Sequence, residues 1–215
     1  MPLYKTLHSA PDIRVYIWKI EEPESWLSEE VVLTPHCQER LDGMRSELHR
    51  RGFLSIRHLM AQEGYKDADL YYDENGKPHL RDGTHISITH SFEFTGIILS
   101  GERQVGIDIE KQRSKILRIA HRFTPMCDYH NAANEEALIR KLTVVWCIKE
   151  SLYKIMGIPG ISFLNHISIG DFDLRDQGAA ARVIYDGHQR AFSTSFLEFE
   201  GFTCAYAIGN RPEAI

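Results

Sequence analysis

One stretch decides the fold of this 215-residue chain: Ser100-Gly101-Glu102-Arg103-Gln104-Val105-Gly106-Ile107-Asp108-Ile109-Glu110. Its first residues predict a turn, and residues 105–110 alternate in polarity as a half-buried strand does. The chain on either side of this turn shows the same order of elements, namely a strand, helices and then several strands. We therefore predict an α+β fold of two similar lobes, residues 1–102 and 103–215, packed as an intramolecular pseudo-dimer.

The two lobes are predicted from local patterns of apolar residues and from turn signals. In the first lobe we expect a strand at 13–18, one helical stretch from about 35 to 62, and strands at 86–90 and 94–100. In the second lobe we expect helices near 116–123 and 135–156, and strands at 167–172, 182–185, 191–196 and 202–208. Asn134 suits the start of the long helix and Gly157 its end.

Composition excludes several classes of protein. Hydrophobic residues make up 43% and charged residues 26%, which is typical of a soluble globular chain. No apolar run has the length of a membrane span, and the N-terminus lacks the features of a signal peptide, so we expect a cytoplasmic protein that does not bind membranes. The formal net charge of -5 argues against a nucleic-acid binder.

The cysteines and histidines do not predict a zinc site. The four cysteines are far apart and form no C-x-x-C pair, so free thiols in a reducing compartment are expected; they are Cys37, Cys127, Cys147 and Cys204.

Two acids share one face of the strand at 105–110. Alternate side chains of a strand point the same way, so Asp108 and Glu110 lie on one face with Cα atoms about 6.6 Å apart. Carboxylates this close repel unless a cation neutralises them, and Mg²⁺ suits such oxygen ligands. The alternative is an ordinary solvated strand face.

The long helix offers a third acid beside an apolar stripe. Trp146, Glu150 and Lys154 follow each other at intervals of four residues and form a flank of that stripe. Glu150 is either a further ligand for the same metal, with Lys154 placed for a phosphate, or half of a surface ion pair. Lys149 falls within the stripe and must either extend its ammonium group to solvent or find a partner.

The first lobe contains candidate anion-binding residues. Five arginines interleave with histidines and form either a solvated helix face or a pocket for a multiply charged anion; they are Arg40, Arg45, Arg50, Arg51 and Arg57. His90 ends a predicted strand, where it is either a core residue or part of an anion site with the hydroxyls of Thr89 and Ser91.

Taken in order, these pieces resemble a known enzyme family. The motifs are Gly76-Lys77-Pro78, Ile88-Thr89-His90-Ser91, Gly106-Ile107-Asp108-Ile109-Glu110 and Trp146-Cys147-Ile148-Lys149-Glu150-Ser151-Leu152-Tyr153-Lys154. They look like those of a 4′-phosphopantetheinyl transferase, and the length and apparent duplication fit the monomeric, pseudo-dimeric surfactin-synthetase type. The resemblance implies transfer of the phosphopantetheine arm of coenzyme A to a serine of an apo acyl or peptidyl carrier protein, with release of adenosine 3′,5′-bisphosphate.

The resemblance also implies roles for single residues. Asp108, Glu110 and Glu150 would hold Mg²⁺, with Mn²⁺ as an alternative, and Lys154 would contact the pyrophosphate. Residues of the first lobe would bind coenzyme A near its 3′-phosphate, namely Arg51, Lys77, Thr89 and His90. The family's general base is a glutamate in a segment like Arg122-Phe123-Thr124-Pro125-Met126-Cys127-Asp128-Tyr129.

Two departures from the family pattern affect this expectation. Asp128 replaces the glutamate and is one methylene shorter, so the base is either Asp128 or a water held by the metal. The lysines that some members place ahead of the arginine helix are absent, and Arg40 is the nearest basic residue. The competing functions are a metal-dependent phosphohydrolase acting on coenzyme A or a nucleotide, and a non-catalytic module that binds coenzyme A or a carrier.

Overall fold

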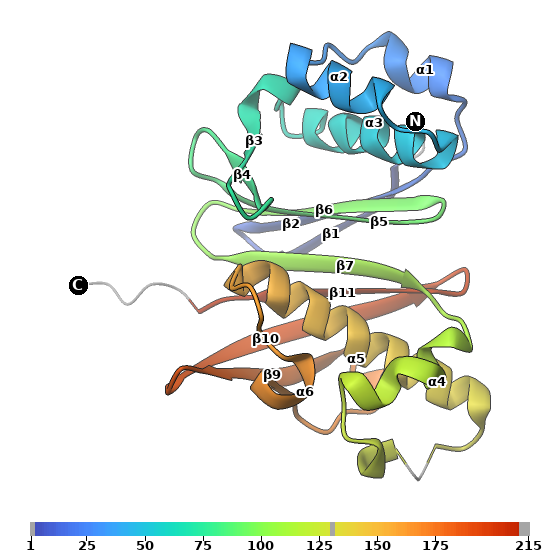
Figure 1. Cartoon of the computed structure of the whole chain (residues 1–215), viewed down its shortest axis with the longest axis vertical. Coiled ribbons are helices and arrows are strands. Elements are labelled where there is room, and N and C mark those ends of the chain that lie inside the picture. Colours follow the sequence, from blue (N-terminus) through green and yellow to red (C-terminus); the bar gives the residue numbers. More distant parts are fainter. Residues whose placement is uncertain (1–2, 130–131, 211–215) are drawn as a thin grey trace. The chain divides into compact units, whose positions relative to one another are not determined.

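The computed structural model describes residues 3–129 and 132–210. It divides into two compact units, Met1–Glu102 and Arg103–Ile215. Figure 1 shows helices and antiparallel strands in both, so the predicted α+β class is confirmed.

The first unit is built on a four-stranded antiparallel sheet in the order β1-β2-β6-β5. These strands are β1 (Leu3–Ala10), β2 (Ile13–Lys19), β5 (His85–Ser91) and β6 (Phe94–Ser100). A separate hairpin is formed by β3 (Leu70–Tyr72) and β4 (Pro78–Leu80). The helices are α1 (Glu24–Glu29), α2 (Pro35–Asp42) and α3 (Glu47–Ala61), with a 3-10 turn η1 (Asp67–Asp69). The buried side of α3 packs on the sheet, where Leu59 and Met60 join Trp18 and Ile97 in the core.

The helical stretch predicted at 35–62 is wrong as a single helix. Thr34 caps the start of α2 by accepting a hydrogen bond from the Cys37 N–H, and α2 ends at Gly43. A new cap forms at Ser46, whose Oγ accepts from the His49 N–H, and α3 begins there. Apolar periodicity continues across the break, which is why the break is hidden in the pattern.

The second unit contains a five-stranded antiparallel sheet in the order β7-β11-β10-β9-β8. Its strands are β7 (Val105–Lys111), β8 (Ile167–Ile169), β9 (Gly178–Tyr185), β10 (His188–Phe199) and β11 (Phe202–Ile208). The helices are α4 (Lys115–Ile119), α5 (Glu135–Met156) and α6 (Phe163–His166), with 3-10 turns η2 (Ala120–Arg122), η3 (Met126–Tyr129) and η4 (Leu174–Asp176). No helix among the described residues is long and apolar enough to span a membrane.

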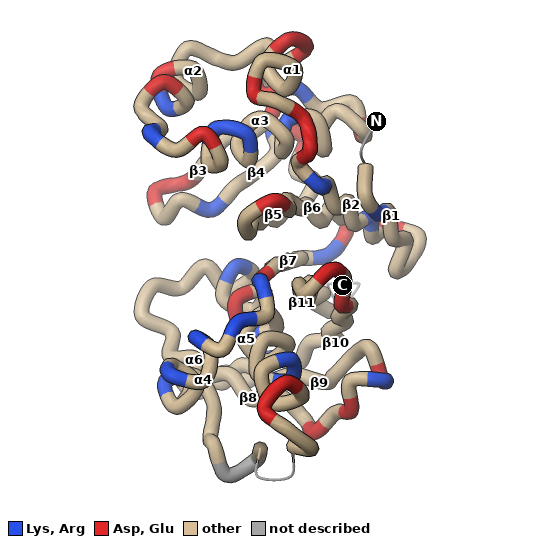
Figure 2. Tube along the Cα trace, turned by 90° about the vertical axis from the view of Figure 1, so that its right-hand side faces the viewer, with Lys and Arg blue, Asp and Glu red and all other residues tan. Residues whose placement is uncertain are grey.

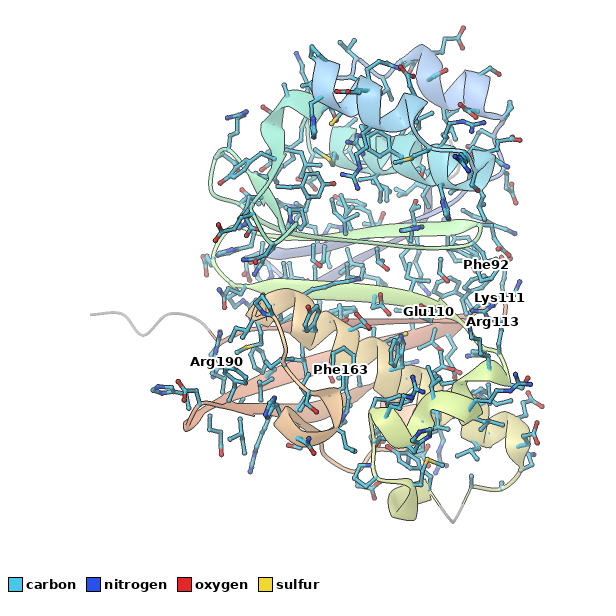
Figure 3. All side chains as sticks on the ribbon, in the orientation of Figure 1. Phe92, Glu110, Lys111, Arg113, Phe163 and Arg190 are labelled. Carbon is cyan, nitrogen blue, oxygen red and sulfur yellow. The ribbon has the colours of Figure 1, made fainter. Side chains whose placement is uncertain are left out.

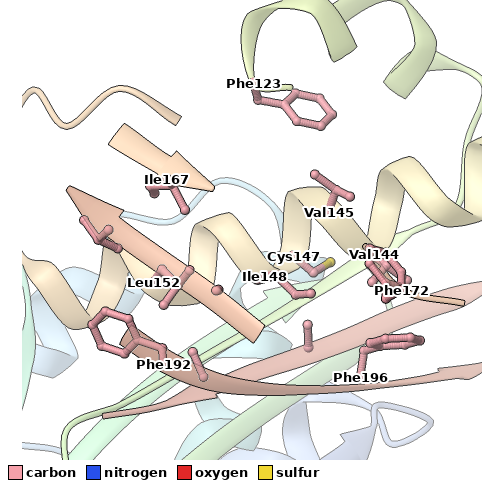
Figure 4. Packing of buried hydrophobic residues seen from close by; sticks show 14 of the residues in the cluster. Phe123, Val144, Val145, Cys147, Ile148, Leu152, Ile167, Phe172, Phe192 and Phe196 are labelled. Atoms are coloured by element: carbon pink, nitrogen blue, oxygen red, sulfur yellow. The ribbon is translucent and has the colours of Figure 1, made fainter. Parts of the chain in front are cut away.

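The long helix α5 lies against β7 and β11 and supplies more of the described core of this unit than any other element. Asn134 accepts a hydrogen bond from the Ala137 N–H at 2.8 Å, and Gly157 ends the helix in the left-handed conformation at φ 60°. Figure 4 shows Ile148 and Leu152 of α5 in the same apolar cluster as Phe192 and Phe196 of β10.

Lys149 lies inside this core and is only 2% exposed. Its Nζ donates to the carbonyl oxygens of Phe163 and Ile167 at 2.6 Å each, and burial lowers its pKa to about 8. These two carbonyl oxygens are the buried partners of a lysine that lies within the apolar stripe of α5.

Candidate active site

Gly106 lets the backbone of α5 approach β7 directly. A Cβ built on Gly106 would lie 2.0 Å from the carbonyl oxygen of Ser151, so a side chain at this position would push the helix away. The Ser151 hydroxyl donates to the Ala205 carbonyl oxygen at 3.0 Å, which ties α5 to β11 as well. The helix is therefore fixed against both strands beside the two acids of β7.

The ammonium group of Lys154 joins α5 to the first acid. Its Nζ donates to the Ile107 carbonyl oxygen at 2.7 Å and to Oδ1 of Asp108 at 2.9 Å. Asp108 is only 7% exposed, and Glu150 lies one helical turn before Lys154. In this structure, Lys154 thus contacts an acid predicted to bind metal.

Negative charge accumulates between β7 and α5. The pKa of Glu150 is raised to about 7, first because burial disfavours its ionised form and then because Asp108 and Glu110 repel its charge. Lys154 opposes this shift. The pKa of the buried Cys147 thiol is raised well above its ordinary value by burial and by the same two acids. Both shifts show three carboxyl groups influencing one small region.

This set of oxygen donors fits a hard divalent cation in its chemistry. Mg²⁺ prefers carboxylates, and a cation would relieve the repulsion that raises the pKa of Glu150. The donors do not form a ready-made site, because no three His, Cys, Asp or Glu side chains within the described ranges are arranged to hold an ion. The side chains would have to move together when the metal binds.

A basic pocket of about 170 Å³ adjoins the second acid. Glu110 lines it together with Lys111, Arg113, Lys115 and Trp146. Figure 3 labels the first three of these residues, which lie together at the end of β7. These cations were not predicted as site residues, although they follow the acidic strand directly and at intervals of two residues.

His90 does not lie in the core but is exposed at the end of β5, whereas its neighbour Thr89 is 4% exposed. His90 lines a pocket of about 310 Å³ in the first unit, along with Arg40, His49 and Tyr72.

Three of the first-lobe residues predicted to bind coenzyme A, namely Arg51, Lys77 and Thr89, are not among the residues that line this pocket. A nitrogen of the Arg51 guanidinium, Nη2, donates to the Ile20 carbonyl oxygen at 3.2 Å. Lys77 lies at the start of the β4 hairpin strand, where its N–H donates to Asp73. The structure therefore brings His90 and Arg40 to one pocket, whose lining does not include Arg51, Lys77 or Thr89.

The arginine cluster is partly neutralised by acids of its own unit. Figure 2 shows acidic and basic residues interspersed along α2 and α3. Arg50 pairs with Glu24 at 2.8 Å, and the buried Arg57 pairs with Asp67 at 2.9 Å. Arg40 instead lies over the ring of Tyr72, with its Cζ 5.3 Å from the ring centroid. The five arginines therefore do not act as one anion pocket.

Comparison with known proteins points to one family. A family model described as the 4′-phosphopantetheinyl transferase superfamily matches residues 104–207, just under half of the chain, which include both acids of β7 and all of α5. This segment is similar to that superfamily. A 4′-phosphopantetheinyl transferase of Bacillus subtilis is 25% identical over 208 residues, covering 90% of this chain and 91% of its own length. The 4′-phosphopantetheinyl transferase Sfp of Bacillus subtilis strain 168 is 26% identical over 209 residues, covering 91% and 90%.

The resemblance stated from the motifs is thereby confirmed: the chain is similar to phosphopantetheinyl transferases both in its family match and over the whole length of two relatives. The family match begins at Gln104, so it covers the site residues on β7 and α5 and not those of the first unit. Asp128 falls in η3, but its side chain lies outside the described part of the structure.

Proposed function

We propose that this enzyme transfers the phosphopantetheine arm of coenzyme A to a serine of an apo carrier protein and releases adenosine 3′,5′-bisphosphate. One observation carries the proposal: Gly106 lets α5 pack directly on β7, which holds Glu150 and Lys154 beside Asp108 and Glu110 in the segment that the family model matches. The carrier would belong to fatty-acid, polyketide or peptide synthesis.

Asp108, Glu110 and Glu150 would hold Mg²⁺ or, with the same donors, Mn²⁺. When bound, such an ion neutralises charge on the phosphate under attack and on the leaving group. Lys154 supplies a further positive charge next to these acids. When coenzyme A binds, the ammonium group of Lys154 would release the carboxylate of Asp108 and bind the pyrophosphate instead. A long, flexible lysine side chain would allow this change of anionic partner.

The first unit would bind the nucleotide end of coenzyme A. Tyr72 and Phe53 supply aromatic surface in the pocket that His90 lines, and Arg40 lies over both rings. Such a lining suits a heteroaromatic base that carries phosphate. Arg51, Lys77 and Thr89 remain proposed contacts near the same phosphate, and Asp128 remains the proposed acceptor of the serine proton.

Mass spectrometry of a panel of apo carriers tests the proposal. Incubation with coenzyme A and Mg²⁺ should add about 340 Da, the mass of the arm, to one carrier serine. The modified serine is mapped by fragmentation, and the same carrier with that serine changed to alanine is the control.

Two other results would contradict the proposal. Release of adenosine 3′,5′-bisphosphate without any carrier would show a phosphohydrolase. Tight binding of coenzyme A without turnover of any carrier would show a binding module. The proposal holds only if bisphosphate release requires the carrier and matches the mass shift in amount.

A further inference from the structure

We propose that His49 is a second imidazole ligand for the phosphate monoester that His90 binds, so that two rings hold this anion together. The inference rests on the proposed function, because it names one more residue that recognises coenzyme A. His49 lies in the first turn of α3 and His90 at the end of β5, two elements that are far apart in the sequence.

The two rings are close and face the same pocket. Their centroids are 6.0 Å apart at an interplanar angle of 84°, and both residues line the 310 Å³ pocket. Edge-to-face rings at this separation can direct one N–H each toward a tetrahedral anion at the pocket mouth. Gly52 lines the same pocket, and a Cβ built on it would lie at ordinary van der Waals distance, 4.0 Å, from Cδ2 of His90.

The ring of His49 has no structural task within the described ranges. It is exposed, makes no side-chain hydrogen bond or ion pair there, and its one ring contact is with His90. A histidine that stabilised the helix would be expected to bind a backbone carbonyl, as His58 does with the carbonyl oxygen of Leu27 at 2.8 Å. His49 is therefore available for a ligand.

The charge of the pocket selects an anion. Its described lining residues include two arginines and two histidines but no carboxylate. Asp67 neutralises Arg57, which leaves Arg40 as the cation of the pocket that carries no acid partner in the described part of the chain. Two imidazoles and one guanidinium around an aromatic floor fit a phosphate monoester on a nucleoside.

The composition of this pocket is related to a departure from the family pattern. The lysines that some members place ahead of the arginine helix are absent from this sequence, and the pocket instead offers arginine and histidine side chains to a phosphate. His49 and Arg40 take that place from α3 and α2, respectively.

The experiment compares coenzyme A with 3′-dephospho-coenzyme A as substrates of His49→Ala. Loss of one hydrogen bond to a charged phosphate should raise KM for coenzyme A at least about tenfold while kcat stays unchanged. KM for the dephospho substrate should not change, because it lacks the phosphate. His36→Ala is the matched control, since His36 is an exposed histidine of α2 outside the pocket lining.

Two further measurements test the role of His49: rescue of substrate discrimination by a second substitution, and direct binding of the two nucleotides. His49→Arg should restore discrimination between the two substrates, because it returns a cationic donor to the same place. Equal changes in KM for both substrates, or none for either, would overturn the inference. Calorimetric binding of both nucleotides to the wild type and to His49→Ala measures the same discrimination without turnover. A chain that binds as expected but modifies no carrier would therefore refute the proposed function and not the role of His49.

Discussion

The carbonyl oxygen of Ser151 lies where a side chain at position 106 would begin. Strand and helix usually meet through side chains, but here they meet through backbone, and this happens two residues before Asp108. The position of the acids relative to Glu150 and Lys154 therefore depends on a residue that takes no part in the chemistry.

Substitution of this glycine should damage the second unit. Gly106→Ala places a Cβ 2.0 Å from the Ser151 carbonyl oxygen, and relief of such a clash by a backbone shift should cost about 3 kcal/mol of unfolding free energy. Urea denaturation followed by circular dichroism measures the loss. Gly101→Ala is the control, because nothing lies within 4 Å of its Cβ. Equal stability of the two variants would show that the close approach is relaxed in solution.

The carboxyl group of Glu150 carries a separate prediction about metal dependence. Glu150→Gln keeps the shape of the side chain but removes one negative charge from the proposed ligand set, so kcat should fall at least about 100-fold. The Mg²⁺ concentration for half-maximal rate should rise in parallel. Glu136→Gln, an exposed change near the start of the same helix, should leave both values unaltered. Full activity of Glu150→Gln at saturating Mg²⁺ would remove Glu150 from the metal site.

At the scale of elements, Lys149 links α5 to α6 and β8. Lys149→Met removes the donor for the Phe163 and Ile167 carbonyl oxygens and leaves both with an unmet hydrogen bond. We expect a loss of about 2 kcal/mol in unfolding free energy by urea denaturation. Lys141→Met is the comparison, since its ammonium group is 3.5 Å from an Asp171 side chain that is 99% exposed. A loss no greater than that of Lys141→Met would mean that the two carbonyls find other donors.

The elements could be predicted where periodicity was strong and both ends had caps. Helix α5 was predicted at 135–156, and the structure has Glu135–Met156, because Asn134 and Gly157 mark its ends. Strand β1 was missed because its sequence, LYKTLHSA, is mostly polar and exposed. Helix α1 was missed because it is only six residues long. The strand predicted at 167–172 is wrong beyond Ile169.

The candidate site was predictable in its residue types but not in its contacts. Strand phase placed Asp108 and Glu110 on one face of β7, and in the structure this is the face that packs on α5 through Gly106. Helix phase placed Glu150 and Lys154 on one flank of α5. Neither phase shows that Lys154 bonds to Asp108 or that Asp67 neutralises Arg57, since each pair joins residues of different elements. The role of His49 was hidden for the same reason.

At the scale of the whole molecule, one buried ion pair should govern acid stability. Burial alone would raise the pKa of Asp67, but hydrogen bonds from the Thr34 N–H and hydroxyl together with the Arg57 charge outweigh it and lower that pKa below 3.8. A lowered pKa in the folded chain means that ionised Asp67 stabilises the fold above its ordinary value. This stabilisation is lost as the pH falls through the lowered value.

Urea denaturation between pH 2 and 7 tests this contribution. Asp67→Asn should reduce the unfolding free energy at pH 7 by about 3 kcal/mol, because it leaves Arg57 buried without its acid partner. The difference from the wild type should shrink as the pH falls through the lowered pKa of Asp67, where the wild-type side chain also becomes protonated. Asp171→Asn, on a 99% exposed side chain, is the control. A difference that is constant over the whole range would contradict the lowered pKa.

The fluorescence of Trp146 can report on changes at the candidate site. Its ring lies 5.1 Å from that of Phe123 and 5.5 Å from that of Phe163, and it lines the basic pocket beside Glu110, one helical turn before Glu150. Rearrangement of the acids would change the polarity around this indole and shift its emission. With Trp18 and Trp26 replaced by phenylalanine, a fluorescence titration could follow ion and nucleotide binding in real time, before any carrier is added.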